Sequence, residues 1–224
     1  MRRLLISGVI VLVSVLVFVV GCSKESGSAA TKPAGSGAAS QPAAAAAATL
    51  ANLQTAFNGE SNAHARYLAF AKQADEAGYG PVASLFRAAA RAEQIHAGKH
   101  AEVIRAMGAG PKADIKTPEV KSIKENLEAA VKGESYERDV MYPEFIQKAR
   151  EEGQKDALRS MNHARNAEIE HATLYSQALA AIESWKEGKK SFYVCPVCGY
   201  TAPTIGFEKC PSCFTAKEKF EQVG

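Results

Sequence analysis

The sequence predicts a mainly α-helical protein, in which a four-helix bundle is followed by a small metal-binding module of strands and loops. Long helix-forming segments fill residues 49–188 and are broken at only a few glycine and proline positions. The two halves of this region repeat each other, and four cysteines follow it within a short stretch. A chain of 224 residues, 46% of them hydrophobic, has room for one sizeable domain and one small one.

Charge and cysteine content exclude two classes of protein. The formal net charge is +3 and includes Arg2 and Arg3 near the N-terminus, so no strongly basic face points to nucleic acid. Five cysteines are too few for a disulfide-dense scaffold of this length.

Residues 1–21 have the pattern of an export signal. Two arginines precede the uncharged, mostly aliphatic run 4–20. An uncleaved membrane anchor is the alternative, because a membrane span needs about 20 apolar residues. Residues 19–22, Val-Val-Gly-Cys, resemble the lipobox of bacterial lipoproteins, in which the cysteine is acylated and the chain is cut just before it. We therefore expect lipidation at Cys22, export, and attachment to a bacterial membrane on its extracytoplasmic side.

Residues 22–48 are expected to form a flexible tether. After Cys22 most of them are Ala, Ser, Gly or Pro, and no large apolar side chain occurs among them. Such a segment cannot bury enough surface to offset the entropy lost on ordering. The alanine run 43–48 could extend the following helix backwards, which leaves this boundary open.

The region 49–188 divides into four predicted helices. Thr49 is the expected N-cap of the first, and Pro81 suits the first turn of the second. Breaks between helices are expected at 78–81, at 107–118 and at Gly153, and the fourth helix is expected to reach about Gly188. Four helices of roughly 25–35 residues in one body predict a four-helix bundle.

An internal repeat relates the two halves of this region. The segment 52–61 recurs as 126–135, with Asn-Leu and Gly-Glu-Ser at matching positions. Further along, the motif Glu-x-x-His at 93–96 recurs at 168–171. The Glu-x-x-His motifs lie one residue further apart in the sequence than the segments 52–61 and 126–135 do. The second half therefore contains one extra residue, which falls near 141–143, inside the third helix. A single insertion in a helix is accommodated as a π-bulge, which predicts one there.

Each half of the repeat carries the same metal-binding side chains. One glutamate follows a glycine, and the Glu-x-x-His spacing places the other two groups on one helix face. Two single glutamates and two such motifs are the ligand set of di-iron and di-manganese carboxylate bundles. Four carboxylates in one core would repel one another unless cations neutralised them. The ligands expected from this pattern are Glu60, Glu93, His96, Glu134, Glu168 and His171.

The remaining histidines and glutamates have no such pattern. A single Glu-x-x-His motif is usually exposed surface, but two of them at matching positions of a repeat argue for a shared site. His64, His100 and His163 are expected at the surface or around the ligands. Glu102 and Glu170 are interpreted as ordinary helix charges.

The helical region resembles rubrerythrin. The segments that carry the resemblance are 52–71, with Gly-Glu-Ser and Ala-Arg-Tyr, and 133–143, with Gly-Glu-Ser-Tyr-Glu and Met-Tyr-Pro. The resemblance extends from about Leu50 to Val223. It implies a ferritin-like di-iron bundle at 49–188 and a rubredoxin-like domain at 189–224.

The resemblance also assigns roles beyond the six patterned ligands. It implies that Glu137 is a seventh ligand, which exchanges with His96 on one iron when the oxidation state changes. Tyr67 and Tyr142 match tyrosines that hydrogen-bond to ligand carboxylates. These four residues are the expected participants in catalysis.

The four C-terminal cysteines form two Cys-x-x-Cys pairs, Cys195 with Cys198 and Cys210 with Cys213. Their spacing alone fits a tetrahedral site for either zinc or iron. The flanking aromatic residues resemble the rubredoxin-like tail of rubrerythrins, which implies one iron. Phe214 stands where free rubredoxins carry glycine, and the spacer between the pairs is short, so zinc stays open as the alternative metal.

The resemblance implies a peroxidase that reduces hydrogen peroxide to water and protects against oxidative stress. Electrons would pass one at a time from a separate donor protein through the rubredoxin-type iron to the two irons of the bundle. The alternatives are a ferritin-like ferroxidase or iron-binding protein, and a non-catalytic, zinc-stabilised metal-binding lipoprotein. In rubrerythrins the tail of one subunit lies near the bundle of another, which implies a homodimer or higher oligomer. Nicotinamide cofactors are scarce outside the cytoplasm, so export predicts a periplasmic or membrane-linked donor.

Overall fold

The computed structural model describes residues 46–224, which belong to one compact unit. The predicted signal, Cys22 and nearly all of the predicted tether lie outside the described residues. Within 46–224, none of the helices combines the length and the apolar character that a membrane span requires.

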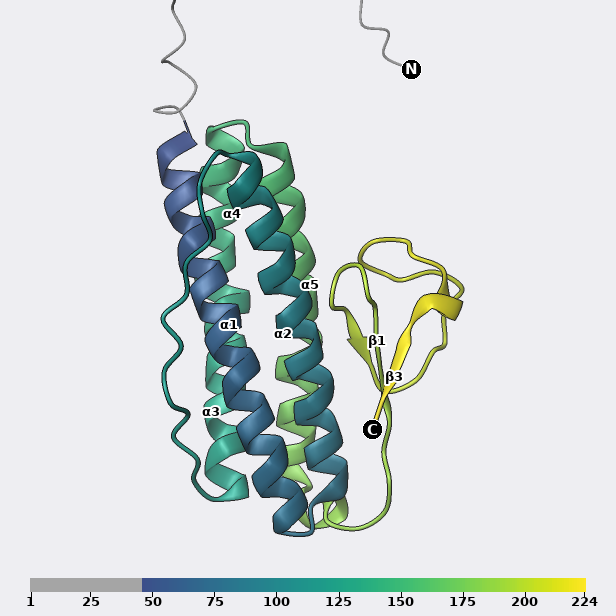
Figure 1. The fold of residues 1–224 in the computed structure, drawn as a ribbon. Helices are drawn as coiled ribbons and strands as arrows, with labels where there is room; N and C mark the ends of the chain where they lie inside the picture. Colours follow the sequence, from purple (N-terminus) through teal and green to yellow (C-terminus); the bar gives the residue numbers. More distant parts are fainter. Residues whose placement is uncertain (1–45) are drawn as a thin grey trace, which may run out of the picture. The chain divides into compact units, whose positions relative to one another are not determined.

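Four long helical segments form the bundle (Figure 1). The first pair is α1 (Ala47–Glu76) with α2 (Gly80–Ala106), and the second is α3 (Ile123–Tyr136) with α5 (Lys155–Ala180). The helices of each pair run in opposite directions. The predicted mainly α-helical class and the predicted four-helix bundle are confirmed.

The predicted insertion appears in the third helical segment. A π-helix (Glu137–Met141) joins α3 to α4 (Tyr142–Glu151). The separation between matching positions of the two halves grows by one residue in this stretch, and the wider π turn accommodates the extra residue. Pro143 follows directly, in the first turn of α4.

Two helix boundaries differ from the prediction. α1 begins at Ala47 and not after an N-cap at Thr49, because alanine is the best helix former and the alanine run continues the helix backwards. α5 ends at Ala180, short of Gly188, and a 3₁₀ turn (Ile182–Trp185) follows. This turn buries Trp185 against the bundle core, where its ring stacks on Phe192.

A long connection between α2 and α3 runs along the bundle, so these two helices point in the same direction (Figure 1). Amide side chains spaced four residues apart on α1 hold this connection. Gln54 binds the backbone at Gly110 and Lys112, and Asn58 and Asn62 bind it at residues 114–116, over 2.7–3.1 Å. One long crossover of this kind occurs in ferritin-like bundles.

Two apolar clusters fill the bundle. One includes Tyr67, Phe86 and Tyr175, and the other includes Leu53 and Met161. Along each long helical segment, the predicted ligands lie between members of the first cluster and members of the second. The site therefore has apolar walls at both ends, which exclude water and strengthen electrostatic interactions inside it.

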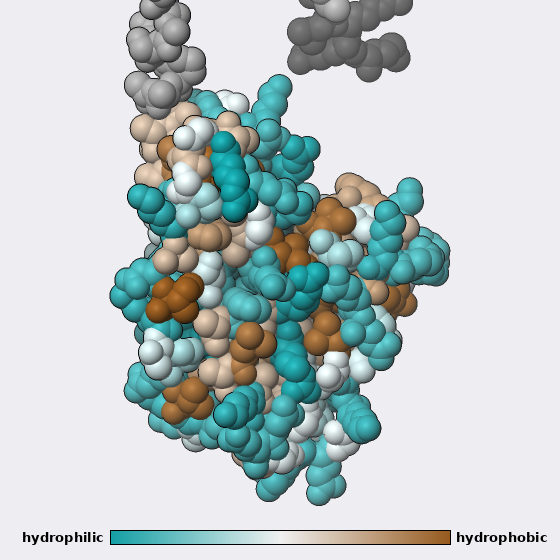
Figure 2. Space-filling view, in the orientation of Figure 1, coloured by the Kyte–Doolittle hydropathy of each residue, from teal (hydrophilic) through white to brown (hydrophobic). Residues whose placement is uncertain are grey.

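The cysteine module contains a three-stranded antiparallel sheet in the order β2-β1-β3. Its strands are β1 (Phe192–Val194), β2 (Thr201–Ala202) and β3 (Glu221–Val223). The module packs on α2 and α5 of its own chain (Figure 1). Figure 2 shows a largely hydrophilic face on which apolar residues occur in small patches. The contact expected between the tail and a second subunit stays a prediction.

Candidate metal centres

The six ligands predicted from the repeat meet in the middle of the bundle, and all six are buried. α1 and α3 each supply one glutamate, and α2 and α5 each supply a glutamate and a histidine. They form two groups of four, in each of which the ligand atoms lie within 4.8 Å of one another. The first group is Glu60, Glu93, His96 and Glu168, and the second is Glu93, Glu134, Glu168 and His171. Glu93 and Glu168 belong to both groups, so their carboxylates can bridge two metal ions.

Both histidines direct Nδ1 towards the shared carboxylates. His96 Nδ1 lies 2.9 Å from Glu93 Oε2 and 3.2 Å from Glu168 Oε1. His171 Nδ1 lies 2.9 Å from Glu168 Oε2 and 3.3 Å from Glu93 Oε1. Each metal ion would therefore receive one imidazole nitrogen and several carboxylate oxygens, a donor set that suits iron.

Unpaired carboxylate oxygens show that the site fits cations. One oxygen of each cluster glutamate has no hydrogen-bond donor among residues 46–224: Glu60 Oε2, Glu93 Oε1, Glu134 Oε2 and Glu168 Oε1. A buried and unpaired charged oxygen is costly. Two divalent cations bound by four carboxylates would satisfy these oxygens and balance their charge.

The proton affinities of the cluster lead to the same conclusion. Burial, together with Glu93, raises the pKa of Glu60 well above its usual range. Burial, with Glu93 and Glu168, raises the pKa of Glu134 to about 8. Burial opposes protonation of His96, but Glu168 and Glu93 outweigh it and raise the pKa of His96 to about 10. The metal-free cluster therefore holds protons that divalent cations would displace.

Two buried tyrosines donate hydrogen bonds to Glu60 and Glu134, the two glutamates that occur in only one of the ligand groups. Tyr67 donates a hydrogen bond to Glu134, and Tyr142 donates one to Glu60. Burial raises the pKa of both phenols, so both stay protonated as donors. Each contact crosses from one half of the repeat to the other. These are the hydrogen bonds that the family resemblance implies for both tyrosines.

Glu137 lies beside the cluster and outside both groups. It is the first residue of the π-helix, and its Oε1 lies 4.0 Å from the position that a Cβ at Gly59 would occupy on α1. Burial and the neighbouring Glu134 raise the pKa of Glu137. In this structure His96 is among the ligand atoms and Glu137 is not, so the seventh ligand stays a prediction.

The four cysteines form the second centre, with all four sulfur atoms within 4.8 Å of one another. The Sγ atoms of Cys195 and Cys213 are 3.5 Å apart, and those of Cys198 and Cys210 are 3.6 Å apart. A disulfide would require about 2.05 Å. A tetrahedral site with metal–sulfur bonds of about 2.3 Å has sulfur–sulfur edges of about 3.8 Å. The cluster therefore fits a rubredoxin-like iron site.

The two Cys-x-x-Cys turns share one backbone conformation. Gly199 N–H donates to Cys195 O over 2.9 Å, and Phe214 N–H donates to Cys210 O over 3.0 Å. The φ angles of Gly199 and Phe214 are +75° and +62°, a region that favours glycine. Phe214 adopts this conformation with its side chain 75% exposed, so the departure from the rubredoxin pattern leaves the turn intact.

The module contacts the outer nitrogens of both ligand histidines. His96 Nε2 lies 3.1 Å from the Cys198 carbonyl oxygen, and His171 Nε2 lies 3.0 Å from Thr201 Oγ1. Such partners fix the ring orientation of a metal-binding histidine. The close approach depends on Gly199, because a Cβ there would lie 2.2 Å from His96 Nε2. One hydrogen bond therefore connects a residue of the thiolate centre with a ligand of the bundle centre.

Two residues make contacts that no sequence pattern specified, although His100 lies around the ligands, one of the two positions expected for it. His100 is fully buried and hydrogen-bonded to Tyr142 and Ser160. Glu170, interpreted as an ordinary helix charge, accepts a hydrogen bond of 3.2 Å from Tyr200 of the module. The repeat holds a signal for His100, because its counterpart in the second half is Tyr175 and the two halves differ there in chemistry.

The fold and the two centres define a class of protein, the ferritin-like carboxylate bundles with a rubredoxin-like module. A family model described as Rubrerythrin matches residues 51–179. The chain is 43% identical over 173 residues to nigerythrin of Nitratidesulfovibrio vulgaris, covering 77% of this chain and 85% of that protein. It is 35% identical over 181 residues to rubrerythrin-2 of Clostridium acetobutylicum, covering 75% and 93%. The chain belongs to the rubrerythrin family.

Solved structures agree with this assignment. A structure of nigerythrin in its fully reduced, all-ferrous state is 41% identical, with a TM-score of 0.73 over 78% of this chain and 86% of that chain. Desulfovibrio desulfuricans bacterioferritin, at 22% identity and a TM-score of 0.61, covers 66% of this chain and 88% of its own, and shares the fold. Family membership identifies the bundle site as a di-iron carboxylate site and indicates an oxidoreductase.

Proposed function

We propose that this protein is a non-haem di-iron peroxidase that reduces hydrogen peroxide to water in defence against oxidative stress. The contact between the two centres carries the proposal: His96 donates from Nε2 to the Cys198 carbonyl and directs Nδ1 towards the bundle carboxylates. When bound, a diferrous pair supplies the two electrons that peroxide requires, and the thiolate iron passes electrons one at a time. Iron storage needs no such relay, which favours turnover over the ferritin-like alternative.

The other residues of the site keep the ligands in place. Tyr67 and Tyr142 hold Glu134 and Glu60 through donated hydrogen bonds, so these carboxylates keep their orientation when the charge of the site changes. We also infer that Glu137 exchanges with His96 as a ligand, and its position beside the cluster on the π-helix supports this inference.

Metal analysis and an ultraviolet–visible spectrum of aerobically purified protein separate the three candidate functions. The peroxidase should contain iron at both centres, show ferric tetrathiolate absorption, and reduce peroxide in steady state with a one-electron donor. A reduced protein that reacts faster with dioxygen than with peroxide would favour a ferroxidase. Zinc at the thiolates and no turnover would favour the non-catalytic lipoprotein.

Two variants separate catalysis from assembly. Glu137→Ala should keep both bundle irons, because six ligands are left, and should slow peroxide turnover. Cys198→Ser should leave the bundle irons in place and abolish reduction by one-electron donors. Normal steady-state rates in Cys198→Ser would remove the thiolate relay from the mechanism.

We also propose that the protein is exported and acts outside the cytoplasm, anchored through lipid on Cys22. The leader and the lipobox-like residues 19–22 support this proposal. A single acyl chain binds a membrane only marginally, so stable anchoring requires the several chains that bacterial lipoproteins carry. The donor would then be a periplasmic or membrane-linked one-electron carrier, and the working unit a homodimer or higher oligomer.

A further inference from the structure

Three consecutive hydrogen bonds lead from the bundle site to the edge of α5. Tyr142 donates to Glu60. His100 Nε2 lies 2.9 Å from the Tyr142 hydroxyl, and His100 Nδ1 lies 2.8 Å from Ser160 Oγ. Tyr142 and His100 are fully buried, and Ser160 is 7% exposed, so the interior part of the path is closed to water.

All three hydrogen bonds point inward. Tyr142 gives its only proton to Glu60, so its oxygen accepts from His100 Nε2–H. A neutral ring protonated at Nε2 has an unprotonated Nδ1, which accepts from the Ser160 hydroxyl. Burial lowers the pKa of His100 to about 3, which keeps the ring in the neutral form that this polarity requires.

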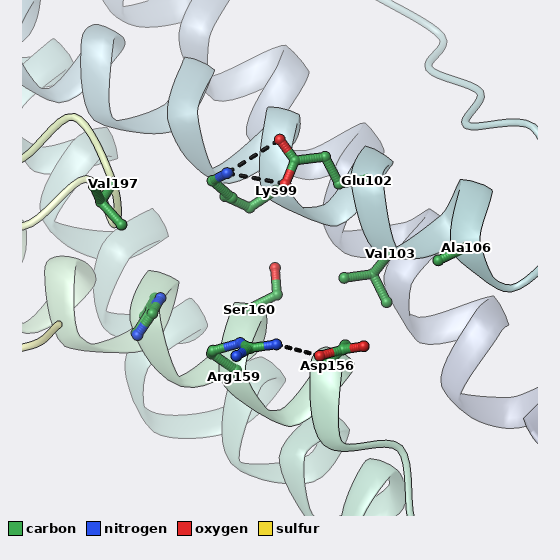
Figure 3. Close-up of a pocket in the computed structure, with 9 residues that line it drawn as sticks. Lys99, Glu102, Val103, Ala106, Asp156, Arg159, Ser160 and Val197 are labelled. Atoms are coloured by element: carbon green, nitrogen blue, oxygen red, sulfur yellow. Dashed lines mark hydrogen bonds and ion pairs between the residues drawn. The ribbon is translucent and has the colours of Figure 1, made fainter.

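The outer end of this path opens into a surface cavity of about 470 Å³ between α2 and α5. Figure 3 shows Ser160 directed into the cavity, between the ion pairs Lys99–Glu102 and Arg159–Asp156. The side chains of Glu102 and Arg159 are 63% and 66% exposed, so water reaches the cavity. Acidic side chains at its rim can exchange protons with solvent.

The other half of the repeat lacks an equivalent path. The counterparts of Tyr142, His100 and Ser160 at the matching repeat positions are Tyr67, Tyr175 and Leu85. Tyr175 packs against Phe86, and its hydroxyl has no hydrogen-bond partner among residues 46–224. Tyr67 nevertheless holds Glu134 as Tyr142 holds Glu60. Holding a glutamate therefore does not require a histidine and a serine behind the tyrosine, and their presence in one half calls for another function.

We propose that Ser160, His100 and Tyr142 form a proton relay from the surface cavity to Glu60 at the di-iron site. The inference rests on the proposed peroxidase function. Reduction of one hydrogen peroxide breaks its O–O bond, takes two electrons from two ferrous ions and two protons from solvent, and yields two water molecules. The relay supplies these protons within a site whose walls exclude water.

Each pass moves one proton inward. Ser160 takes a proton from a water molecule of the cavity as it gives its own to His100 Nδ1. His100 gives its Nε2 proton to Tyr142, and Tyr142 gives its proton to Glu60. Glu60 then releases the proton to an oxygen atom of the peroxide, which leaves as water, so Glu60 is a carboxylate again before the next pass. The two hydroxyls and the imidazole ring then re-orient before the next pass.

Stopped-flow mixing of fully reduced protein with hydrogen peroxide tests the relay. A pH indicator follows proton uptake while absorbance follows iron oxidation. His100→Leu should keep both bundle irons and slow both signals about a hundredfold, the low end of what a positioned proton donor contributes. Tyr175→Phe removes the hydroxyl at the matching position of the other half and should react at the wild-type rate. Wild-type kinetics in iron-loaded His100→Leu would overturn the relay.

Chemical rescue separates a relay from a structural role. His100→Ala leaves a cavity that free imidazole can fill, and added imidazole should restore a large part of the lost rate. Slow kinetics that imidazole leaves unchanged, in a variant with full iron content, would contradict proton transfer through this position.

A measurement on wild-type protein does not depend on turnover or on a folded variant. In full-length protein labelled with ¹⁵N-histidine and loaded with zinc, the His100 imidazole should be neutral, with the proton on Nε2. A proton on Nδ1, or on both nitrogens, would overturn the inward polarity. If wild-type protein did not react with peroxide, the proposed function would fail, and the nitrogen spectrum would still decide whether the hydrogen bonds of the path point inward.

Discussion

At the residue scale, the two shared carboxylates have the greatest effect on the metal site. Glu93 and Glu168 belong to both ligand groups, and each has one oxygen without a hydrogen-bond donor among residues 46–224. We expect Glu93→Ala or Glu168→Ala to lose bundle iron and to reduce peroxide turnover more than roughly 100-fold. Removing a residue that only hydrogen-bonds to a metal ligand costs up to about 100-fold, and these two residues are ligands themselves. Iron analysis and steady-state rates measure this. Glu76→Ala, an exposed position at the end of α1 away from the cluster and the cavity, is the matched control.

Two irons per bundle and full turnover in either ligand variant would contradict the assignment. The ligand types themselves were predictable from the sequence, because the repeat presents each of them twice. His100 and Ser160 were not predictable in the same way. Their function depends on two hydrogen bonds that His100 makes with residues of the other half of the chain, Tyr142 and Ser160, and no spacing within a helix encodes these contacts.

Gly199 is a second position where one side chain decides the geometry. A Cβ there would lie 2.2 Å from His96 Nε2, and its φ of +75° is unfavourable for alanine. We expect Gly199→Ala to cost about 1–3 kcal/mol of module stability and to slow reduction of the bundle iron. Denaturant unfolding and donor-driven reduction rates test this. Gly206→Ala is the control, because a Cβ there meets nothing within 4 Å, and it should change neither the stability nor the reduction rate. A wild-type reduction rate in Gly199→Ala would show that electron delivery does not depend on the contact between the module and His96.

At the scale of elements, the π-helix shows how far a sequence can lead. The repeat spacing grows by one residue between its first and last segments, which predicted an insertion near 141–143, and the π-helix Glu137–Met141 ends there. The path of the α2–α3 connection was not predictable. It depends on hydrogen bonds from Gln54, Asn58 and Asn62, and amides on a helix surface have no distinctive pattern.

The four-helix bundle should respond to pH in opposite ways with and without metal. In the metal-free state burial raises the pKa of Glu134 from 4.5 to about 8, so the folded state binds more protons than the unfolded state between these values. This contribution to stability is present below pH 4.5 and is lost as pH rises through 8. His96 has the same sign between 6.5 and about 10, and Glu93, whose pKa is lowered, titrates below this window. His100, whose pKa burial lowers from 6.5 to about 3, has the opposite sign between these two values and offsets part of the effect below pH 6.5.

Chelator-treated protein should therefore unfold at lower urea concentration at pH 8 than at pH 5. The iron-loaded protein should show the reverse, because metal ions replace those protons and bind more tightly as the ligands deprotonate. Greater stability of the metal-free protein at pH 8 would argue against the buried carboxylate cluster.

At the scale of the whole molecule, the sequence predicted both domains but not their contact. The module is held on its own bundle by the paired hydrogen bonds of Arg91 with Glu221, at 2.7 and 2.9 Å, and by contacts at Glu170 and Asn166. These residues are ordinary surface types in the sequence. Only the fold brings them together, and the same contact places the thiolate turn against both ligand histidines.

The position of the whole molecule in the cell depends on residues 1–48, which combine a positive start, an aliphatic run, a lipobox-like cysteine and a linker-like composition. We expect native protein to fractionate with membranes on the extracytoplasmic side, and its mature N-terminus to be an acylated Cys22. Cys22→Ser should abolish acylation and cleavage at this site. Fractionation of both proteins, with mass analysis of the mature N-terminus, provides the test, and the iron content of the Cys22→Ser bundle is the control for folding.

An enzyme at that location would intercept peroxide before it enters the cytoplasm and would draw electrons from a periplasmic or membrane-linked carrier. Soluble cytoplasmic protein that begins at Met1, unchanged by the substitution, would refute both the anchor and the donor.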